Sequence, residues 1–349
     1  MHSPLSPEMT VRSFTSSSKE RNGADRWRRT LICGLLGTVI VLGAWEAFWR
    51  AWGFAPVLED DLGIWAVIRR GVDRAGGPAI VLLGASRMQL DVDPRILRAE
   101  TGRKAAMLAI DGSSPLPVLA DLAGRSSFDG LIICSLLPQW LADGGEDRGR
   151  SARWVRKYHR QKWSFWIETR LSLFLQGSFV FRYRGLLPDR LWRNFLEGEM
   201  PRPPYAPMRS DRYRPADYRL TDIAQLRAAR LDRQREIVAA AKPLGEAEFA
   251  ARLARIEDMV QGIRNRGGSV IFVRLPSCGE TLELEEAAWP RGKYWDRFAA
   301  TTSARTLHFA DHPELSSFDC PDGSHLDHRD ASSFTRALVE VLGLGQDKP

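Results

Sequence analysis

Five short apolar segments, separated in part by helical patterns, constrain the fold of this chain most strongly. They lie at residues 79–83, 104–110, 130–135, 269–275 and 306–310. Helical patterns occur at residues 62–74, 116–124, 293–302 and 331–342. Strands that alternate with helices form parallel sheets covered by helices on both faces. The sequence therefore predicts an α/β fold, a three-layer doubly wound parallel sheet of about five strands.

A turn of small residues follows the first apolar segment. Gly84, Ala85 and Ser86 end the strand and place a hydroxyl directly after it. Open parallel sheets carry their ligand sites at the carboxyl ends of the strands, where a serine on a tight turn can present its Oγ to a substrate. Gly and Ser are also common in ordinary turns for local conformational reasons. Ser86 is therefore a candidate nucleophile that needs a base from elsewhere in the chain.

Residues that can activate a serine occur near the end of the chain. Asp322 lies three residues before His325 in the loop segment 319–331, DCPDGSHLDHRDA, next to the predicted helix 331–342. A loop carboxylate and imidazole at this spacing can face one cavity, with the carboxylate holding the imidazole in the tautomer that a general base needs. Ser86, Asp322 and His325 together are the side chains of an acyl-transfer triad.

These motifs resemble those of the SGNH (GDSL-like) hydrolase superfamily over residues 78–135 and 265–343. The chain looks most like its membrane-anchored members that act on cell-envelope polymers, such as those that O-acetylate alginate or D-alanylate teichoic acid. The resemblance implies an SGNH/flavodoxin-like fold in which Ser86 matches the nucleophile, Gly112 the second-block oxyanion donor, and Asp322 and His325 the last-block pair. It implies no cofactor and no metal.

Two departures from the family pattern affect the expected oxyanion site. The usual Gly-Asp-Ser is here Gly84-Ala85-Ser86 followed by Arg87, and residues 134–138 read Cys-Ser-Leu-Leu-Pro where the family has a Gly-x-Asn-Asp block. Loss of an Asn donor could remove roughly 3 kcal/mol of transition-state stabilisation. Arg87, Ser135 and Gln139 are possible substitutes. The turn at residues 111–115 can also bring backbone N–H groups to the site, which makes Ser113 a further candidate for oxyanion or substrate binding.

The first fifty residues predict a membrane anchor. Residues 1–25 are rich in Ser, Pro and Thr and are expected to be a disordered cytoplasmic tail. Residues 26–52 begin with a basic cluster and continue as an apolar run that ends among tryptophans, which fits one transmembrane helix with its N-terminus in the cytoplasm. A cleaved signal peptide and a buried helix are the alternatives. We expect residues 53–139 and 265–349 to form the α/β domain in the periplasm, anchored in a bacterial inner membrane.

Residues 140–264 interrupt the α/β pattern and are expected to form a mainly helical insertion. Residues 144–162 are rich in Arg and Lys, and residues 163–183 are rich in Trp and Phe. Such a segment suits anionic lipid or a membrane partner; alternatively, its aromatic side chains pack on the core and its cations are solvated. The formal net charge of +7 suggests an anionic surface or polymer nearby. An exported domain makes nucleic-acid binding improbable, so we expect none.

Cysteine and histidine spacing suggests two further features. Cys278 and Cys320 lie in loops after late elements, and a disulfide between them would stabilise by about 4 kcal/mol; two free thiols are the alternative. Residues of the kinds that bind metals also gather near the end of the chain: His308, Asp311, His312, Asp327 and His328. Their spacing matches no zinc pattern, so exposed histidines and turn-forming aspartates are the preferred interpretation.

The resemblance implies a serine esterase or O-acyltransferase acting on ester-linked acyl groups of a cell-envelope or exported polysaccharide, with acetyl as the expected acyl group. Its expected partners are an acyl donor, a polysaccharide acceptor and a multi-pass membrane acyltransferase. The alternative is a catalytically degenerate domain that serves as a binding or assembly subunit of an envelope polysaccharide machine. The third-block departure favours this alternative, whereas the intact Ser86, Asp322 and His325 argue against it.

Overall fold

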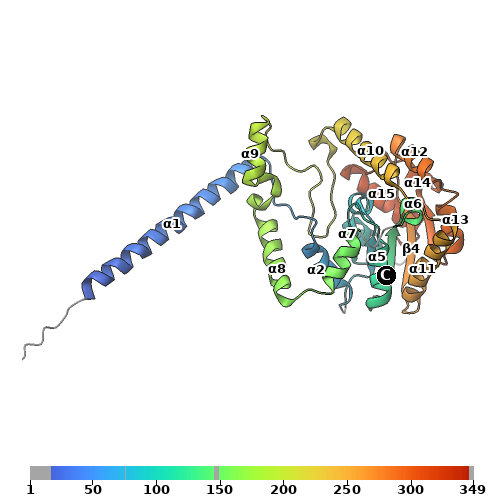
Figure 1. Ribbon diagram of the computed structural model, residues 1–349, viewed down its shortest axis with the longest axis horizontal. Coiled ribbons are helices and arrows are strands. Elements are labelled where there is room, and N and C mark those ends of the chain that lie inside the picture. The colour runs from blue at the N-terminus through green and yellow to red at the C-terminus, as the bar shows by residue number, and fades with distance from the viewer. Residues whose placement is uncertain (1–16, 75, 145–148, 346–349) are drawn as a thin grey trace, which may run out of the picture. The chain divides into compact units, whose positions relative to one another are not determined.

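The computed structural model describes residues 17–74, 76–144 and 149–345 (Figure 1). The chain divides into two compact units, one ending at Phe54 and the other beginning at Ala55. The division falls two residues after the predicted end of the anchor. Residues 1–16 of the predicted tail and Arg148 of the basic segment lie outside the described residues.

The first unit is one long helix, α1 (Ser17–Ala51). Its segment Arg26–Ala51 spans 26 residues, and the most apolar part is not buried by any other segment of the protein. Tryptophans gather near its end, where Trp45 and Trp49 pack edge to face with ring centroids 5.6 Å apart. The length and composition fit a membrane anchor or a signal sequence. The helix begins at Ser17, so part of the segment predicted to be disordered is helical.

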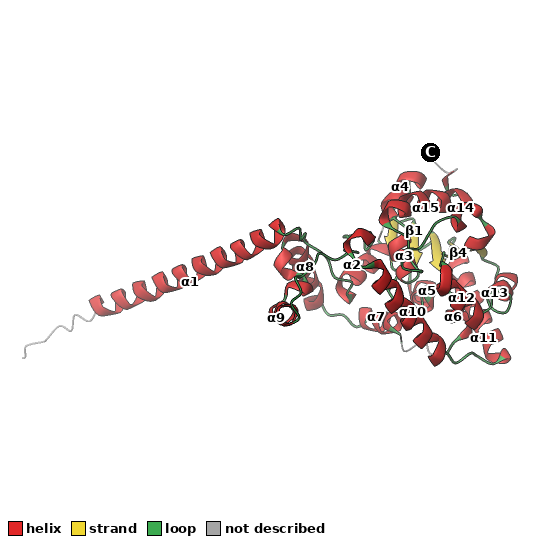
Figure 2. Cartoon of the chain, turned by 90° about the horizontal axis from the view of Figure 1, so that it is seen from above, coloured by secondary structure: helices red, strands yellow, loops and turns green. Residues whose placement is uncertain are grey.

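A five-stranded parallel sheet forms the centre of the second unit (Figure 2). The strands are β1 (Ile80–Leu83), β2 (Ala105–Met107), β3 (Leu131–Ser135), β4 (Ser269–Arg274) and β5 (Arg305–His308). Their order is β2-β1-β3-β4-β5, and each neighbouring pair is parallel. All five predicted strands are confirmed, although β2 is shorter than expected.

Alternate residues of each strand enter two separate hydrophobic cores. Val81 and Leu83 of β1 pack on one face of the sheet, and Ile80 and Leu82 pack on the other. The first face is covered by α2 (Leu62–Val72), α5 (Leu116–Arg125), α11 (Glu246–Arg264) and α13 (Trp295–Thr301). The second is covered by α4 (Pro94–Thr101), α14 (Pro313–Ser316) and α15 (His328–Val341). The α/β class and its three layers are therefore as predicted.

Helix α11 belongs to this sandwich, although its residues were assigned to the insertion. Its buried side chains, among them Phe249, Ile256 and Val260, pack in the same core as Ile132 of β3 and Phe272 of β4. Helix α11 is thus the crossover helix that returns the chain from the insertion to β4. An apolar periodicity identifies a helix but does not say which surface it covers, and for this reason the boundary was placed too late.

The remainder of the insertion consists of α7 (Arg150–Tyr158), α8 (Trp163–Ser178), η2 (Val180–Arg182), η3 (Arg184–Leu186), α9 (Pro188–Leu196), η4 (Tyr218–Leu220) and α10 (Ile223–Ala240). Some of its aromatic side chains pack on the core: Trp154 lies 6.1 Å from Trp65 of α2 between ring centroids, and Phe165 and Trp166 are partly buried. Others, such as Trp163 and Phe174, are exposed. Packing of the aromatic side chains on the core is therefore confirmed for part of this segment, and contact of the exposed part with lipid or a membrane partner stays a prediction.

Three short helices and one more turn complete the second unit. They are α3 (Ser86–Asp91), α6 (Pro138–Ala142), α12 (Gly279–Ala288) and η5 (Phe309–Asp311). Helix α12 was not predicted, and it contributes a buried carboxylate to the candidate site described next.

Candidate active site

The turn between β1 and α3 places Ser86 at the junction of β1 and β3. Ser86 is the first residue of α3, directly beyond the carboxyl end of β1. Gly84 makes this turn possible, because its φ is +153° and an added Cβ would lie 2.8 Å from Cβ of Met88 and 2.9 Å from Cβ of Ser135. Strand β1 is where the strand order of the sheet reverses, and open α/β sheets bind their ligands at such a point.

Three side chains from opposite ends of the chain form one hydrogen-bonded series. Nε2 of His325 lies 2.8 Å from Oγ of Ser86, and Nδ1 of His325 lies 3.0 Å from Oδ2 of Asp322. Both His325 and Asp322 are buried. The structure thus brings together the three predicted catalytic residues in the geometry of a nucleophile, a general base and the carboxylate that orients the base.

The surroundings of the pair favour a neutral imidazole and an ionised carboxylate. Burial lowers the pKa of His325, against the opposing effect of Asp322. Burial also disfavours the charge of Asp322, but the charge of His325, the hydrogen bond to its ring and the Arg230 guanidinium together hold the pKa of Asp322 below its ordinary value. A neutral His325 can accept the proton of Ser86 at neutral pH.

Backbone hydrogen bonds fix the loop that carries Asp322 and His325. Oδ1 of Asp322 accepts hydrogen bonds from the N–H groups of Ser324, at 2.9 Å, and His325, at 2.8 Å. The buried carboxylate of Asp91 accepts the N–H of Leu326 at 3.0 Å. Since Asp91 ends α3, the helix that begins with Ser86 also holds the loop that carries its base.

The chain after β2 brings Gly112 to the cavity that Ser86 lines. The N–H of Ile110 donates to the carbonyl of Gly84 at 3.0 Å, so this segment stays beside the β1 turn after the regular strand has ended. Gly112 then adopts a φ of +62°, and it lines the same cavity as Ser86. Within the described parts of the chain, neither the Gly112 N–H nor the Ser86 N–H donates a hydrogen bond. Both are available as oxyanion donors.

Ser113 does not lie where it was predicted. Its N–H donates to the carbonyl of Ile110 at 3.2 Å, and its side chain lines a neighbouring pocket rather than the cavity of Ser86. The turn that gives Gly112 its positive φ directs the next residue away. Ser113 is therefore not an oxyanion donor in this arrangement.

Arg87 is part of a buried ion-pair network behind the nucleophile. Its Nη2 donates to Oε1 of Glu285 at 2.6 Å and its Nε to Oγ of Ser324 at 3.1 Å, while Arg274 donates to the other oxygen of Glu285 at 2.5 Å. Burial would raise the pKa of Glu285, but the two guanidinium groups lower it to about 2. Nη1 of Arg87 is buried and has no hydrogen-bond partner among the described residues. The network thus carries a net positive charge next to the triad.

Helix α10 of the insertion adds Arg230, which sequence reasoning missed. Nε of Arg230 lies 2.6 Å from Oδ2 of Asp322, and its Nη2 donates to the hydroxyl of Tyr205 at 2.9 Å. The ring of Tyr205 in turn packs against that of Tyr218. No spacing in the sequence connects a helix of the insertion with a loop almost a hundred residues later, so no local signal could have identified Arg230.

A cavity of about 380 Å³ opens beside the triad. Its lining comes from every part of the site: Ser86 and Arg87 of α3, Asp111 and Gly112, Ser135 at the end of β3, Gln139 of α6, Arg230 and Arg233 of α10, and His325. This volume is within the range of small-molecule sites. Arg87, Ser135 and Gln139, the proposed substitutes for the absent Asn, all line the cavity.

Cys278 and Cys320 are neighbours but are present as free thiols. The pKa of Cys278 is lowered to about 7, mainly by the hydrogen bond that it shares with Cys320. The N–H of Cys278 also donates to the carbonyl of Gly323, in the loop of Asp322, at 3.1 Å. Their disulfide stays a prediction.

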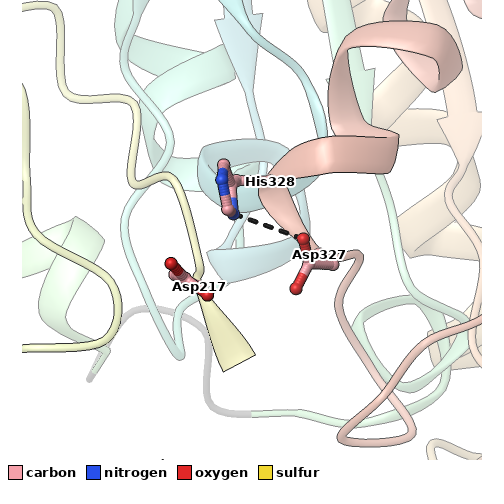
Figure 3. A group of neighbouring side chains, drawn as sticks. All are labelled: Asp217, Asp327 and His328. Carbon is pink, nitrogen blue, oxygen red and sulfur yellow. Dashed lines mark ion pairs between the residues drawn. The ribbon is translucent and has the colours of Figure 1, made fainter. Parts of the chain in front are cut away.

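Asp217, Asp327 and His328 form the one group in the described residues with the spacing of metal ligands (Figure 3). Asp327 caps the first turn of α15, and Arg329 donates to both of its carboxylate oxygens at 2.7 and 2.9 Å. Arg219 likewise holds both oxygens of Asp217, and the ring of His328 lies 3.1 Å from the carbonyl of Ala216. These contacts account for the group without a metal ion: Asp327 caps a helix, and each of the two aspartates pairs with an arginine.

Two more members of the suggested metal set, His308 and Asp311, have local partners. Nδ1 of His308 accepts the N–H of Ala310 at 3.2 Å, and burial lowers the pKa of His308 to about 3. Asp311 pairs with Arg291 through both of its oxygens. Local contacts therefore account for both residues, but His308 is buried and not exposed as expected.

The site as a whole has the geometry of a serine-based acyl-transfer centre. Comparison with known proteins finds no family model that matches the chain and no matching curated protein. The arrangement of Ser86, His325, Asp322 and Arg230 therefore defines the candidate active site by itself.

Proposed function

We propose that this protein is a serine esterase or O-acyltransferase. One observation supports the proposal above all others: the Ser86 hydroxyl, the His325 imidazole and the Asp322 carboxylate form a continuous hydrogen-bonded series, and its Ser86 and His325 line a cavity of about 380 Å³. Such a series converts a serine into a nucleophile for ester carbonyls. A hydrogen-bonded series that served only to stabilise the fold would not need a cavity beside it.

In the proposed reaction, Oγ of Ser86 attacks the carbonyl carbon of an acyl ester while Nε2 of His325 takes its proton. The tetrahedral intermediate then expels the alcohol, which receives that proton from His325, and an acyl group remains on Ser86. A second acceptor, either water or a sugar hydroxyl, gives its proton to His325 and attacks the acyl carbonyl. The bond between the acyl group and Oγ of Ser86 then breaks, and His325 returns the proton to Oγ. Water makes the enzyme an esterase, and a sugar hydroxyl makes it a transferase.

The oxyanion would be stabilised by backbone donors and by the positive charge behind Ser86. The free N–H groups of Ser86 and Gly112 are its proposed donors, and removal of one such donor typically costs 2.7–4 kcal/mol of transition-state stabilisation. Arg87 would add a positive charge near the oxyanion, which a neutral Asn donor does not carry. Its unpartnered Nη1, together with Arg230 and Arg233 in the cavity lining, favours a substrate that carries negative charge or many hydrogen-bond acceptors.

We further propose that the α/β unit is an SGNH-like domain held at a membrane. The position of the nucleophile after β1 and of the Asp-x-x-His pair before the last helix supports the family, and the apolar helix α1 supports an inner-membrane anchor with the domain in the periplasm. A cell-envelope or exported polysaccharide is the proposed acceptor, with acetyl as the acyl group. A multi-pass membrane acyltransferase is the proposed source of that group.

A binding or assembly subunit is the second candidate. The Cys134–Pro138 segment, which replaces the third-block Asn, favours it. A binding subunit has no need for a neutral base within 2.8 Å of a serine hydroxyl, so the geometry of the triad favours the enzyme.

Covalent labelling with a serine-directed fluorophosphonate tests the proposal. The wild-type protein is expected to label, while Ser86→Ala and His325→Ala lose at least about a thousandfold in labelling rate, because the nucleophile or its base is gone. The exposed Ser317 provides the matched control: Ser317→Ala should label like the wild type. A wild-type protein that stays unlabelled, beside an esterase that labels under the same conditions, would establish the binding subunit instead.

A further inference from the structure

Helix α8 exposes a continuous row of large apolar side chains. Trp163 is 76% exposed, Ile167 58%, Leu171 57% and Phe174 62%. Their spacing of four, four and three residues places them along one side of a helix. Amphipathic helices normally turn such a row toward a core. Here it faces away from the core of its own unit.

Helix α9 continues this exposure. Trp192 is 64% exposed, Phe195 73% and Leu196 68%, and α9 has no buried residue at all. The rings of Trp192 and Phe195 stack with centroids 5.8 Å apart. In both views α8 and α9 lie on the same side of the second unit, away from its sheet (Figures 1 and 2). We call the seven side chains of these two helices the α8–α9 apolar surface.

An apolar surface of this kind marks an interaction site. Single exposed apolar residues are ordinary, but large contiguous patches on a soluble face favour contact with another protein or with a membrane. Burial of apolar side chains is favourable in proportion to the apolar area removed from water. Seven such side chains together favour a stable contact over a transient one.

The chain connection between α1 and α8 favours the membrane as the occupant. The N–H of Glu59 donates to Oε1 of Gln176 in α8 at 2.9 Å, and the carboxylate of Glu59 pairs with Arg184, between α8 and α9. Glu59 follows the end of α1 at Ala51 by eight residues, which span at most about 28 Å when extended. If α1 crosses a bilayer, as the proposed function holds, α8 cannot lie farther from its surface than this short tether allows.

Exposed cations accompany the apolar surface. Lys162 precedes α8, Arg170 lies within it and Arg193 lies within α9, and all three are exposed. None of the three pairs with a carboxylate in the described part of the chain. Trp, Phe and Leu side chains with nearby Lys and Arg are typical of helices that lie in the interface of an anionic membrane.

We propose that the α8–α9 apolar surface is a second membrane contact that lies in the interfacial layer of an anionic bilayer and orients the α/β unit on it. The proposal rests on the proposed anchor but is separate from the chemistry at Ser86. The apolar side chains enter the boundary between headgroups and acyl chains, while Lys162, Arg170 and Arg193 face lipid phosphates.

Site-specific photo-crosslinking in the full-length protein tests this surface. Benzoylphenylalanine replaces Phe174 or Phe195, and Leu220, which is exposed but lies outside the surface, serves as the control position. The purified variants are reconstituted in vesicles of phosphatidylethanolamine and phosphatidylglycerol. Positions 174 and 195 are expected to form phospholipid adducts at least about five times more often than position 220, and at least about threefold more often than in phosphatidylcholine vesicles.

Equal adduct yields at positions 174, 195 and 220 would overturn the proposal. Crosslinks at 174 and 195 that form only in native membranes, and only to another protein, would overturn it in favour of a protein partner. Flotation of the same samples reports on the anchor and fluorophosphonate labelling reports on Ser86. Loss of the anchor or of Ser86 reactivity is therefore distinguishable from absence of the proposed lipid contact.

Discussion

At the scale of single residues, Gly84 controls whether Ser86 can act. It adopts a φ of +153°, and its Cα faces Met88 of α3 on one side and Ser135 of β3 on the other. Any side chain here would push α3 away from β3. Because Ser86 begins α3, such a shift would move Oγ relative to Nε2 of His325, 2.8 Å away.

Gly84→Ala is therefore expected to reduce both stability and reactivity. The new Cβ would lie 2.8 and 2.9 Å from two other Cβ atoms in a conformation that alanine rarely adopts, at a cost of about 2–4 kcal/mol in the free energy of unfolding. Fluorophosphonate labelling should slow at least tenfold. Gly124→Ala in α5 is the matched control: nothing lies within 4 Å of its added Cβ, and unfolding in urea should show a change within about 1 kcal/mol. Equal behaviour of the two variants would contradict this role of Gly84.

The site residues that sequence could predict are those with a local signature. Ser86 follows an apolar strand, and Asp322 and His325 share one loop before a helix, so each has a recognisable neighbourhood. Glu285 and Arg230 lack one, because an acidic residue in α12 and an arginine in α10 resemble solvated helix residues until tertiary packing buries Glu285 and brings Arg230 to Asp322. Ser113 was misplaced for a related reason: the turn residues indicate a change of direction but not which N–H will face the cavity.

At the scale of elements, α10 turns the insertion into part of the site. It contributes Arg230 and Arg233 to the cavity lining, and Arg230 contacts the carboxylate of Asp322. The positive charge of Arg230 is one of the causes that lower the pKa of His325, after burial, which is the largest. The insertion thus affects the base that acts on Ser86.

Arg230→Gln is expected to shift the acid limb of the pH profile to higher pH. Activity requires neutral His325, so kcat/KM rises with pH through the pKa of its imidazole, which in the wild type lies below the ordinary 6.5. Removal of the guanidinium makes protonated His325 less unfavourable and raises that pKa. Arg233→Gln, on the same helix and paired with Glu236 rather than Asp322, should leave the limb in place. Coincident pH profiles of wild type and Arg230→Gln would exclude a positioning role for Arg230.

The elements themselves were predicted well where a local pattern decides them. The strands are buried apolar runs, and α5, α13 and α15 have clear apolar faces, so their positions follow from sequence. The sandwich helix α11 was separated from its domain because its partners, Ile132 and Phe272, lie far away in the chain. Strand β2 is predicted to reach residue 110 but ends at Met107, where the carbonyl of Leu108 accepts the indole N–H of Trp65; the N–H groups of Leu108 and Ile110 still donate to the carbonyls of Leu82 and Gly84.

At the scale of the whole molecule, the apolar helix α1, as an anchor or as a signal sequence, bears on the proposed location of the cavity. No other described helix is long and apolar enough to cross a membrane. The basic residues that flank the apolar part of α1, Arg26 to Arg29, lie on its amino-terminal side, which favours a cytoplasmic N-terminus. The α/β unit would then be on the opposite side of the membrane.

Membrane extraction and a reporter fusion test this topology. The full-length protein should remain in the membrane fraction at alkaline pH, and alkaline phosphatase fused to its C-terminus should be active because export allows its disulfides to form. The double variant Val39→Arg/Ile40→Arg should be extracted, since each arginine at a helix centre costs about 2.5–3.5 kcal/mol on insertion; Arg26→Lys/Arg28→Lys keeps the charge and should behave like the wild type. A mature protein whose mass lacks the first forty or so residues would show a cleaved signal sequence instead.

The assembly of the triad from distant parts of the chain also has a consequence for biosynthesis. Ser86 leaves the ribosome early, but its base, His325, follows only after 239 further residues, and Arg230 lies between them. A nascent or truncated polypeptide carries an inert serine. Under the proposed function, reactivity toward esters would therefore begin only when the finished chain has folded.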